Sequence, residues 1–347
     1  MNPRRLVGAV AALSGAALSV FALRRYRRDL RFARERIAAG SRIVETAVGP
    51  IECAEAGEGP PVFVVHGAGG GFDQGMQLSR PLVDAGFRVV APSRFGYLRT
   101  PLPSDSPGGP FRTGPEGASG AAFSRRDASA AAQADAHAAL LDALSIERTA
   151  VVGVSAGAPS AMQLALRHPG RVSALVLLVP AAYPARVART SRGGMPERLS
   201  RANALVLDAA LRSDFLFWLL CRAAPRTTTR AILGTDPEVL AAASPEERAR
   251  AERVVSNLLP ISRRRLGLRN DAAVTGSLPR YELERIAAPT LVVSVEDDLY
   301  GTWEGARHSA DHIPGARFIG YPSGGHLWVG HHRKLMGEVV AFLRGAT

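Results

Sequence analysis

Cysteine is scarce in this sequence, and its scarcity argues against two kinds of protein. Cys53 and Cys221 are the only cysteines among 347 residues, and neither belongs to a CxxC or Cys/His spacing. A disulfide framework and a zinc site are therefore not indicated, and we expect two buried thiols and no metal ion or other cofactor. Apolar residues make up 46% of the chain and charged residues 21%, which is typical of a globular protein with a packed core.

Lysine is nearly absent, because Lys334 is the only one among 43 basic residues. The net charge of +12 is unevenly placed along the chain. Residues 1–36 contain nine arginines against Asp29 and Glu35, a net of +7, which leaves +5 for the other residues. A nucleic-acid interface needs basic residues gathered on a folded surface. Because the basicity is largely confined to the N-terminal segment, we expect no nucleic-acid partner.

Charge is missing altogether from Leu6 to Leu23, a run of 18 residues with two arginines before it and four shortly after it. That length is near the lower limit for a helix that spans a bilayer. A signal peptide would need a small-residue cleavage site after the run, but arginines follow directly. The heavier positive charge on the C-terminal side predicts an uncleaved membrane anchor within residues 1–36, with the rest of the chain in the cytoplasm. Export and a poorly ordered leader are the alternatives.

Short β-branched runs alternate with helical patterns over residues 40–180 and 286–347. The predicted strands are Arg42 to Val48, Ile51 to Ala56, Val62 to Val65, Arg88 to Ala91, Thr149 to Val152, Ala174 to Val179, Thr290 to Val295 and Ala316 to Gly320. The helical patterns between them include Gln74 to Ala85, Ala128 to Leu144 and Ala156 to Arg167. This alternation predicts an α/β fold with a mostly parallel, doubly wound sheet of about eight strands.

Two segments interrupt this alternation. Residues 181–285 have little strand signal and helical patterns at Pro196 to Ala210, Ser213 to Arg222, Pro237 to Ala242 and Pro245 to Leu258. We expect a helical cap or lid inserted over the carboxyl edge of the sheet, where ligands bind in open α/β sheets. Residues 98–126 are rich in Gly, Pro and Ser, which predicts a flexible surface loop or, alternatively, an active-site flap.

The sequence Gly153-Val154-Ser155-Ala156-Gly157 is the strongest chemical signal. It closes a predicted strand and opens a predicted helix, which is the context in which G-x-S-x-G places a nucleophilic serine on a strained turn. The helix N-terminus behind the turn offers free N–H groups to a developing oxyanion. A Gly/Ser-rich turn without chemistry is the alternative, and we favour Ser155 as a nucleophile.

A glycine-rich segment, His66 to Gly71, directly follows the predicted strand Val62 to Val65. Glycines there allow main-chain amides to face a reacting carbonyl, so the N–H groups of Ala68 and Ala156 are expected to form an oxyanion hole. A phosphate-binding loop is the rival interpretation. Neither a GxGxxG order nor a GK[ST] ending is present, which weakens that rival. We expect His66 to structure its own loop.

The general base and its acid are expected after the last two strands of the sheet. Of the eight histidines, His326 is the one that a Gly-Gly turn precedes after a strand. Glu296, Asp297 and Asp298 follow the strand that ends at Val295, and one of them should accept a hydrogen bond from the histidine. We favour Asp298, which is 28 residues before His326, with Asp297 as the close competitor.

These residues, in the order serine, acid, histidine, resemble the α/β-hydrolase superfamily over roughly residues 40–346. Val62 to Gly71 resembles the family's strand and HGxGG loop, Ala91 to Tyr97 its A-P-D-x-x-G-x-G-x-S segment, and Val293 to Tyr300 its H-G-x-x-D segment. The last resemblance supports Asp298, since the family's acid is the final Asp of that segment. Departures from the family pattern occur at Ser93, Leu98, Thr100, Ser294 and Val295.

The resemblance implies a carboxylesterase-like serine hydrolase in which His326 takes the proton of Ser155 as Oγ attacks an ester-like carbonyl. A serine nucleophile argues against haloalkane dehalogenases and epoxide hydrolases, which use aspartate. Carbon–carbon bond hydrolases and lactonases share the serine triad and stay open as alternatives. A non-catalytic, membrane-associated scaffold with a hydrolase fold is the alternative of another class, and it would be indicated by a lost triad residue.

The substrate is expected to be a small, apolar acyl compound. Gly67, Phe95 and Trp328 are the expected substrate-binding residues. The apolar segment Phe215 to Trp218 is consistent with an apolar substrate, but core packing alone would also place such residues there. We give these two interpretations of the segment equal weight.

Overall fold

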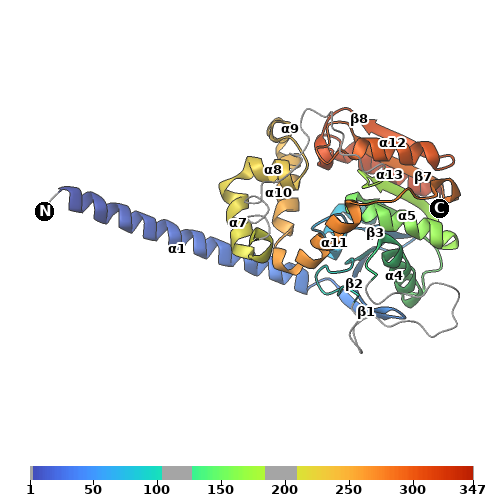
Figure 1. Ribbon diagram of the computed structural model, residues 1–347, viewed down its shortest axis with the longest axis horizontal. Coiled ribbons are helices and arrows are strands. Elements are labelled where there is room, and N and C mark those ends of the chain that lie inside the picture. Colours follow the sequence, from blue (N-terminus) through green and yellow to red (C-terminus); the bar gives the residue numbers. More distant parts are fainter. Residues whose placement is uncertain (1–2, 104–126, 184–208, 347) are drawn as a thin grey trace.

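The computed structural model describes residues 3–103, 127–183 and 209–346, with side chains from residue 19 onward (Figure 1). Eight strands of these residues form one sheet in the order β1-β2-β4-β3-β5-β6-β7-β8. The strands are β1 (Arg42–Thr46), β2 (Gly49–Ala56), β3 (Pro61–Val65), β4 (Arg88–Pro92), β5 (Thr149–Val154), β6 (Val172–Leu178), β7 (Thr290–Val295) and β8 (Arg317–Tyr321). β1 and β2 pair antiparallel, β2 and β4 pair antiparallel, and the other pairs are parallel. The predicted doubly wound, mostly parallel sheet is confirmed.

Helices cover both faces of the sheet, so its central strands are buried on both sides. One face packs against α4 (Ala130–Ala143), α5 (Ala158–Arg167) and α12 (Thr302–His312). The other face packs against α2 (Phe72–Leu78), α3 (Arg80–Asp84) and α13 (His332–Ala346). Double burial explains why β5 and β7 are mostly apolar and rich in valine instead of alternating between apolar and polar residues.

The helix predicted over residues 74–85 is two helices in the structure, α2 and α3. The break is at Ser79, whose Oγ donates to the carbonyl of Gly75 at 2.6 Å. Pro81 lies two residues on and has no N–H group to continue the first helix. The helix pattern was therefore right about the type of structure and wrong about its continuity.

Besides the helical residues 209–212, five helices of the described residues lie between β6 and β7: α7 (Asp214–Ala223), α8 (Pro225–Ile232), α9 (Pro237–Ala241), α10 (Pro245–Asn257) and α11 (Arg265–Thr275). We call them the insertion helices. α10 begins with the Ser244 side chain accepting from the N–H of Glu247, a hydrogen bond typical of a helix N-cap. α8 and α11 were not predicted, because the threonine run of α8 and Gly267 in α11 have low helix propensity. The helix predicted from Pro196 lies mostly outside the described residues, as do residues 104–126 of the predicted loop.

Helix α1 (Pro3–Ala38) projects from the body, and its C-terminal part lies against the insertion helices (Figure 1). Leu30 and Ala33 are buried there. Among the residues whose side chains are described, no helix combines the length and apolarity needed to cross a bilayer. Most of the segment expected to span a membrane, Leu6 to Leu23, lies outside the residues whose side chains are described.

Candidate active site

Ser155 occupies a strained turn between β5 and α5. Its φ of 49° lies in the left-handed region, which is uncommon for a residue other than glycine. The turn requires close approach of backbones, since a Cβ on Gly157 would lie 2.5 Å from the carbonyl oxygens of Val65 and His66. Only glycine fits at that position without displacing β3. The geometry holds the Ser155 side chain at the carboxyl edge of the sheet.

His326 comes from a turn after β8 and lies beside Ser155. Its Nε2 is 3.0 Å from the Ser155 Oγ, although 171 residues separate them. Gly325, which precedes it, has a φ of 62°, and a Cβ there would lie 2.5 Å from the Thr235 hydroxyl. The Gly-Gly turn is thus required both for its conformation and for the close approach of the insertion segment.

Asp298 follows β7 and lies on the other side of His326. Its Oδ2 is 2.8 Å from the Nδ1 of His326, and its side chain is fully buried. Two further donors bind this carboxylate: the N–H of Tyr300 at 2.8 Å and the hydroxyl of Thr302. A buried carboxylate needs such hydrogen bonds, and together they fix its orientation toward the histidine.

Asp297, the competing acid, binds the backbone of the turn that carries His326. Its carboxylate accepts from the backbone N–H groups of Gly324 at 3.2 Å and Gly325 at 2.7 Å. The two neighbouring aspartates therefore contact different parts of the same turn: Asp298 the side chain of His326 and Asp297 the backbone before it. The geometry favours Asp298 as the partner of the histidine.

The glycine-rich segment after β3 lies directly across from Ser155. A Cβ on Gly67 would be 3.3 Å from the Cβ of Ser155. Ala68 and Ala156 both line the cavity into which Ser155 opens. The N–H groups of these two residues are therefore the candidates for an oxyanion hole beside Ser155.

The family assignment follows from a comparison with known protein families. A family model described as "alpha/beta hydrolase fold" matches residues 60–329, more than three quarters of the chain. The chain belongs to the α/β-hydrolase fold family. It is therefore a hydrolase by family, and its fold is that of the family.

Individual relatives of this α/β hydrolase are distant. An uncharacterized hydrolase of Bacillus subtilis is 27% identical over 300 residues, which cover 84% of this chain and 94% of the relative. A 2-hydroxy-6-oxo-6-phenylhexa-2,4-dienoate hydrolase of Comamonas testosteroni is 32% identical over 135 residues, covering 36% of this chain and 38% of that protein. An α/β-hydrolase fold protein from Nakamurella multipartita has a solved structure with a TM-score of 0.64 and 27% identity, covering 88% of this chain and 100% of that one.

His66 structures the glycine-rich loop of this hydrolase, as expected. Its Nε2 accepts the N–H of Arg94 at 3.0 Å, so the ring proton is on Nδ1, which donates to the carbonyl of Gly67 at 2.7 Å. Burial, together with the nearby charge of Arg94, lowers the pKa of His66 well below its usual value. The imidazole is therefore neutral in the folded protein, which both hydrogen bonds require.

A buried ion pair that the sequence did not predict joins the insertion to this loop. The Arg94 guanidinium binds Asp271 of α11 through two hydrogen bonds of 2.6 and 2.7 Å and donates to the Gly67 carbonyl at 3.2 Å. The Tyr97 hydroxyl donates to Asp271 at 2.5 Å and accepts the N–H of Gly69 at 3.0 Å. Burial disfavours the charge of Arg94, but Asp271 outweighs it and raises the guanidinium pKa.

A second buried ion pair fixes the far end of the loop. Arg264 donates to the carboxylate of Asp73 at 2.7 Å and to the carbonyl of Gly70. Arg36, near the end of α1, donates to the same carboxylate at 3.2 Å and to the carbonyl of Leu259 at 2.6 Å. Asp73 therefore joins α1, the insertion and the glycine-rich loop. No local pattern indicates such a pairing, because its members come from three distant parts of the chain.

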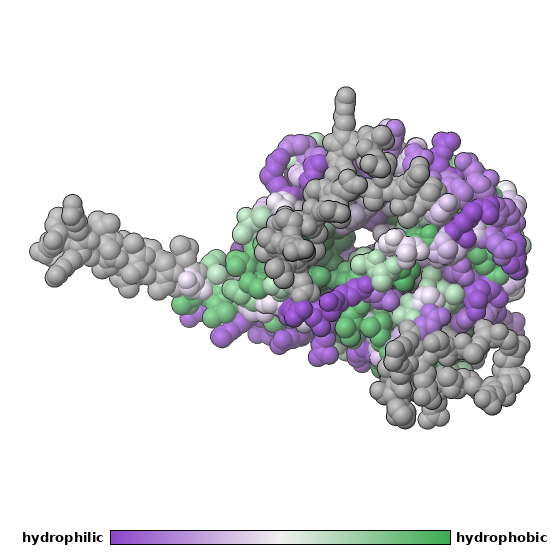
Figure 2. Space-filling model, in the orientation of Figure 1, coloured by the Kyte–Doolittle hydropathy of each residue, from purple (hydrophilic) through white to green (hydrophobic). Residues whose placement is uncertain are grey.

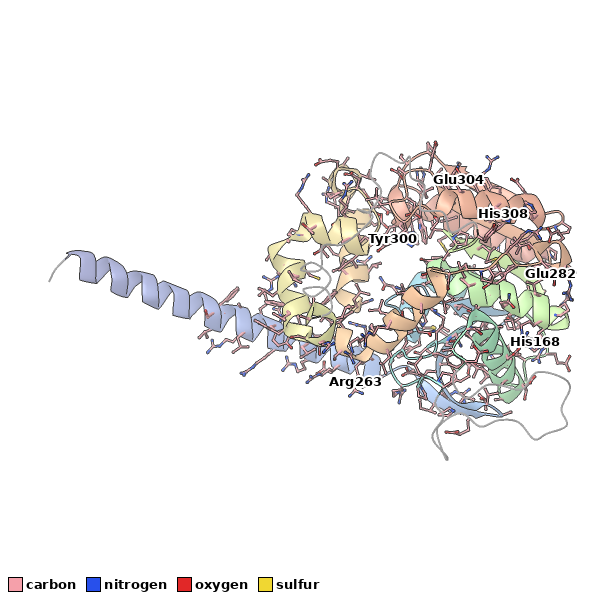
Figure 3. The ribbon with its side chains drawn as sticks, in the orientation of Figure 1. His168, Arg263, Glu282, Tyr300, Glu304 and His308 are labelled. Carbon is pink, nitrogen blue, oxygen red and sulfur yellow. The ribbon has the colours of Figure 1, made fainter. Side chains whose placement is uncertain are left out.

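Ser155 opens into a cavity of about 1450 Å³ between the sheet and the insertion helices. Figure 2 shows the molecule hollowed on this face. Apolar residues of the lining include Val179, Leu233, Val254, Leu268, Leu278 and Leu299. Tyr300 lies between the insertion helices and α12 (Figure 3), and its hydroxyl donates to the carbonyl of Ala231 at 2.9 Å. The cavity therefore has a largely apolar wall beside the serine.

Two of the three expected substrate-binding residues, Gly67 and Trp328, line this cavity, and Phe95 does not. Phe95 is only 1% exposed and belongs to the core on the α4 side of the sheet. Its N–H donates to the Gln133 side chain at 2.7 Å, which turns the segment toward α4. The expectation for Phe95 is therefore wrong: the residue packs under the site instead of facing it.

The apolar segment Phe215 to Trp218 also lies away from the cavity lining. Phe217 and Trp218 are buried in a separate cluster with Ala33 of α1 and Leu258, Leu259 and Ile261 of the insertion. Core packing therefore accounts for these two residues.

Among the described residues, no group of three or more His, Cys, Asp or Glu side chains is placed to hold a metal ion.

Proposed function

We propose that this α/β hydrolase cleaves a small, apolar ester-like substrate with Ser155 as nucleophile, His326 as general base and Asp298 as the orienting acid. The observation that carries the proposal is the continuous hydrogen-bonded chain from the Ser155 Oγ to His326 and on to Asp298, with distances of 3.0 and 2.8 Å. Three residues from separate strand ends meet there in the relative positions that nucleophilic acyl transfer requires.

The hydrogen bonds define the proton movements in the proposed reaction. With Nδ1 of His326 donating to Asp298, Nε2 is unprotonated and can accept the Ser155 proton as Oγ attacks the carbonyl carbon. The imidazolium that forms is stabilised by the buried Asp298 carboxylate. It then gives its proton to the leaving oxygen, and a water activated in the same way releases the acyl group.

Charge on the carbonyl oxygen is stabilised by the segments around Ser155. We assign the N–H groups of Ala68 and Ala156 as the donors, since both residues line the cavity at the serine. The ion pairs of Arg94 with Asp271 and Arg264 with Asp73 hold the loop that carries Ala68. Preorganised donors of this kind stabilise the transition state without a reorganisation cost.

The apolar lining around Ser155 supports an apolar acyl group as substrate. Val179, Leu233, Leu299 and Trp328 supply apolar surface next to the reacting centre. Burying an acyl chain of a few carbons there gains about 0.8 kcal/mol per methylene. The proposal is therefore an esterase-type activity on short apolar esters.

A fluorophosphonate probe tests the proposal directly, because it reacts with activated serines. The expected result is labelling of the wild-type protein, none of Ser155→Ala, and unchanged labelling of Ser160→Ala, a buried serine on the following helix. Hydrolysis of short p-nitrophenyl esters should follow the same pattern. Absence of labelling in a well-folded wild-type protein would instead favour the non-catalytic scaffold.

Hydrolysis of a carbon–carbon bond by the same triad is the second candidate. It is favoured by the similarity to a 2-hydroxy-6-oxo-6-phenylhexa-2,4-dienoate hydrolase. The compound in that name carries a ketone, its 6-oxo group, and no ester. That similarity covers only 38% of the relative. Parallel assays with an ester, a lactone and a β-diketone distinguish the candidates: preferred turnover of the diketone would replace the esterase proposal and keep the triad.

We also propose that residues 6–23 attach the protein to a membrane with the hydrolase on the cytoplasmic side. The uncharged run and the arginines that follow it support this placement. The proposal concerns location only and is independent of the chemistry at Ser155.

A further inference from the structure

Helix α7 is apolar on two faces, and only one of them is buried. Phe217 and Trp218 are each 5% exposed and pack into the cluster beneath the helix. On the outer face, four large apolar side chains are 38–41% exposed: Phe215, Leu216, Leu219 and Leu220. A surface helix normally carries polar residues on its outer face. An apolar outer face this regular indicates a contact with something outside the described fold.

Helix α1 continues the same apolar surface. Val20, Phe21 and Leu23 are 40–63% exposed, and Ala22 between them packs against the cluster under α7. We define the α1/α7 surface as the exposed residues of both helices: Val20, Phe21, Leu23, Phe215, Leu216, Leu219 and Leu220. Figure 2 shows hydrophobic surface where α1 meets the body.

Contacts between the two helices make this surface one unit. The Tyr26 ring meets Phe215 edge-on at 5.1 Å and Trp218 at 5.7 Å. The Asp29 carboxylate accepts from the Trp218 indole at 3.0 Å and from Arg222 at 3.0 Å. Because these contacts fix α7 on α1, both helices present their apolar residues together.

Arginines border the apolar residues on α1. Arg24, Arg25 and Arg27 are exposed, and none of the three forms a salt bridge with another described residue. From Arg24 to Arg36 there are seven arginines against Asp29 and Glu35, a net charge of +5. Apolar side chains next to arginines that lack a salt bridge within the described residues match the boundary between acyl chains and anionic headgroups, where each arginine contributes about 1 kcal/mol.

We propose that the α1/α7 surface docks on the face of a bilayer that contains anionic lipids. Leu216 and Leu219 enter the acyl region, and Arg24, Arg25 and Arg27 lie at the headgroups. A second copy of the chain fits less well, because a two-fold interface on this surface would bring the two arginine clusters together. The α7 helix lies at the end of the body from which α1 projects (Figure 1), so the attachment proposed for residues 6–23 places α7 at the bilayer.

The test uses the full chain with a tryptophan on the α7 face, Leu219→Trp, and a matched control, Ile43→Trp. Ile43 is a similarly exposed apolar residue, 38% against 40%, on β1 at a different part of the molecule. Quenching of tryptophan fluorescence by lipids brominated in their acyl chains reports which position reaches the membrane. Vesicles of phosphatidylcholine alone and of phosphatidylcholine mixed with phosphatidylglycerol provide the two surfaces.

The fluorescence of Leu219→Trp is expected to be quenched in the mixed vesicles and less in phosphatidylcholine. Ile43→Trp should show no more quenching than the three native tryptophans give in the wild-type protein. Equal quenching of the two variants overturns the docking proposal, whatever binding occurs through residues 6–23. Equal quenching of Leu219→Trp in both vesicles overturns the role of the arginines. Labelling of Ser155 by the fluorophosphonate probe is unaffected by either result, so this proposal and the catalytic one fail separately.

A double variant, Leu216→Ser with Leu219→Ser, tests how much these two leucines contribute to the affinity for vesicles, without adding an aromatic residue. Both side chains are exposed, so the fold should be retained. Removing two leucines from the acyl region should weaken binding to mixed vesicles about tenfold. If the wild-type protein instead forms a dimer without lipid by sedimentation velocity, and the double variant abolishes it, the surface is an interface between copies and the membrane proposal is overturned.

Discussion

The Oδ2 of Asp298 lies 2.8 Å from the Nδ1 of His326, across 28 residues of chain. The preceding residue, Asp297, is used differently, since it accepts two backbone N–H groups of the turn before the histidine. One aspartate therefore orients the imidazole and the other holds its backbone. This division makes distinct predictions for the two side chains.

Asp298→Asn should reduce kcat on an ester substrate by about 10⁴-fold, because an amide in that position favours the wrong histidine tautomer. Asp297→Asn keeps an oxygen that can accept one N–H of the turn, so this variant should lower kcat by about tenfold or less. Steady-state kinetics on the same ester checks both. A larger loss for Asp297→Asn than for Asp298→Asn would reverse the assignment.

Tyr97→Phe should lower kcat about tenfold with little change in KM. The hydroxyl accepts the N–H of Gly69 and donates to Asp271, so its loss loosens the loop that carries Ala68 without removing a group at the substrate. Tyr281→Phe is the control, because its hydroxyl is paired with Gln163 instead of the loop. A change confined to thermal stability in both variants would reduce Tyr97 to a structural role.

Acid should destabilise the fold through its buried histidines. Burial lowers the pKa of His137 from 6.5 to about 3, and burial with Arg94 lowers that of His66 well below the usual value. Below pH 6.5 the unfolded chain therefore binds protons that the folded protein does not, so the free energy of unfolding falls as pH falls. For His137 the loss should be about 2 kcal/mol between pH 6.5 and about pH 5, and His66 should add to it in the same direction.

Urea unfolding of the wild type and of His137→Gln at these two pH values measures this effect. His137→Gln removes one titrating group, so the difference in the free energy of unfolding between the two conditions should shrink by about 2 kcal/mol. The free energies of unfolding at the two pH values are compared within each protein. Any loss of stability that the substitution causes equally at both pH values therefore cancels. An unchanged pH dependence would show that His137 is protonated in the folded state.

Both cysteines should resist alkylation in the folded protein. Burial raises the pKa of the Cys53 and Cys221 thiols to about 11, so thiolate is scarce near neutral pH. Iodoacetamide at about pH 8 should label neither residue until urea is added, and then label both. Mass spectrometry of the intact protein counts the labels, and rapid native labelling of Cys53 would contradict its place in the core.

Deletion of residues 1–18 tests the proposed anchor while keeping the contacts of α1 with the body. Tyr26, Asp29, Ala33 and Arg36 remain in the shortened chain, so α7 stays covered on its inner face. The full chain should sediment with membranes and resist a high-salt wash, whereas the shortened chain should be released by salt. Equal behaviour of both chains in the wash would exclude a spanning anchor.

Local sequence patterns were sufficient for the sheet, for the turn of Ser155 and for the Gly-Gly turn before His326. Each of these depends on residues adjacent in the chain: β-branched runs form buried strands, and glycines allow a left-handed or crowded backbone. The position of Asp298 at the end of β7 was predictable for the same reason, as part of a strand end. Local chemistry did not separate it from Asp297, because neighbouring carboxylates have the same chemistry; the spacing to His326 and the resemblance to the family's H-G-x-x-D segment favoured Asp298, which is the residue that contacts His326.

Tertiary structure alone decided which distant residues meet. Arg94 and Asp271 are 177 residues apart, and no periodicity links them. Phe95 appeared suited to the substrate site, but the bond of its N–H to Gln133 places it in the core. The segment Phe215 to Trp218 was equally consistent with a substrate site and with core packing, and contacts with α1 decide for packing at Phe217 and Trp218. The sequence by itself determined the strands and the turns at which the chemistry is placed, since these are local; the pairing of buried charges and the direction of apolar side chains depend on contacts that exist only once the chain has folded.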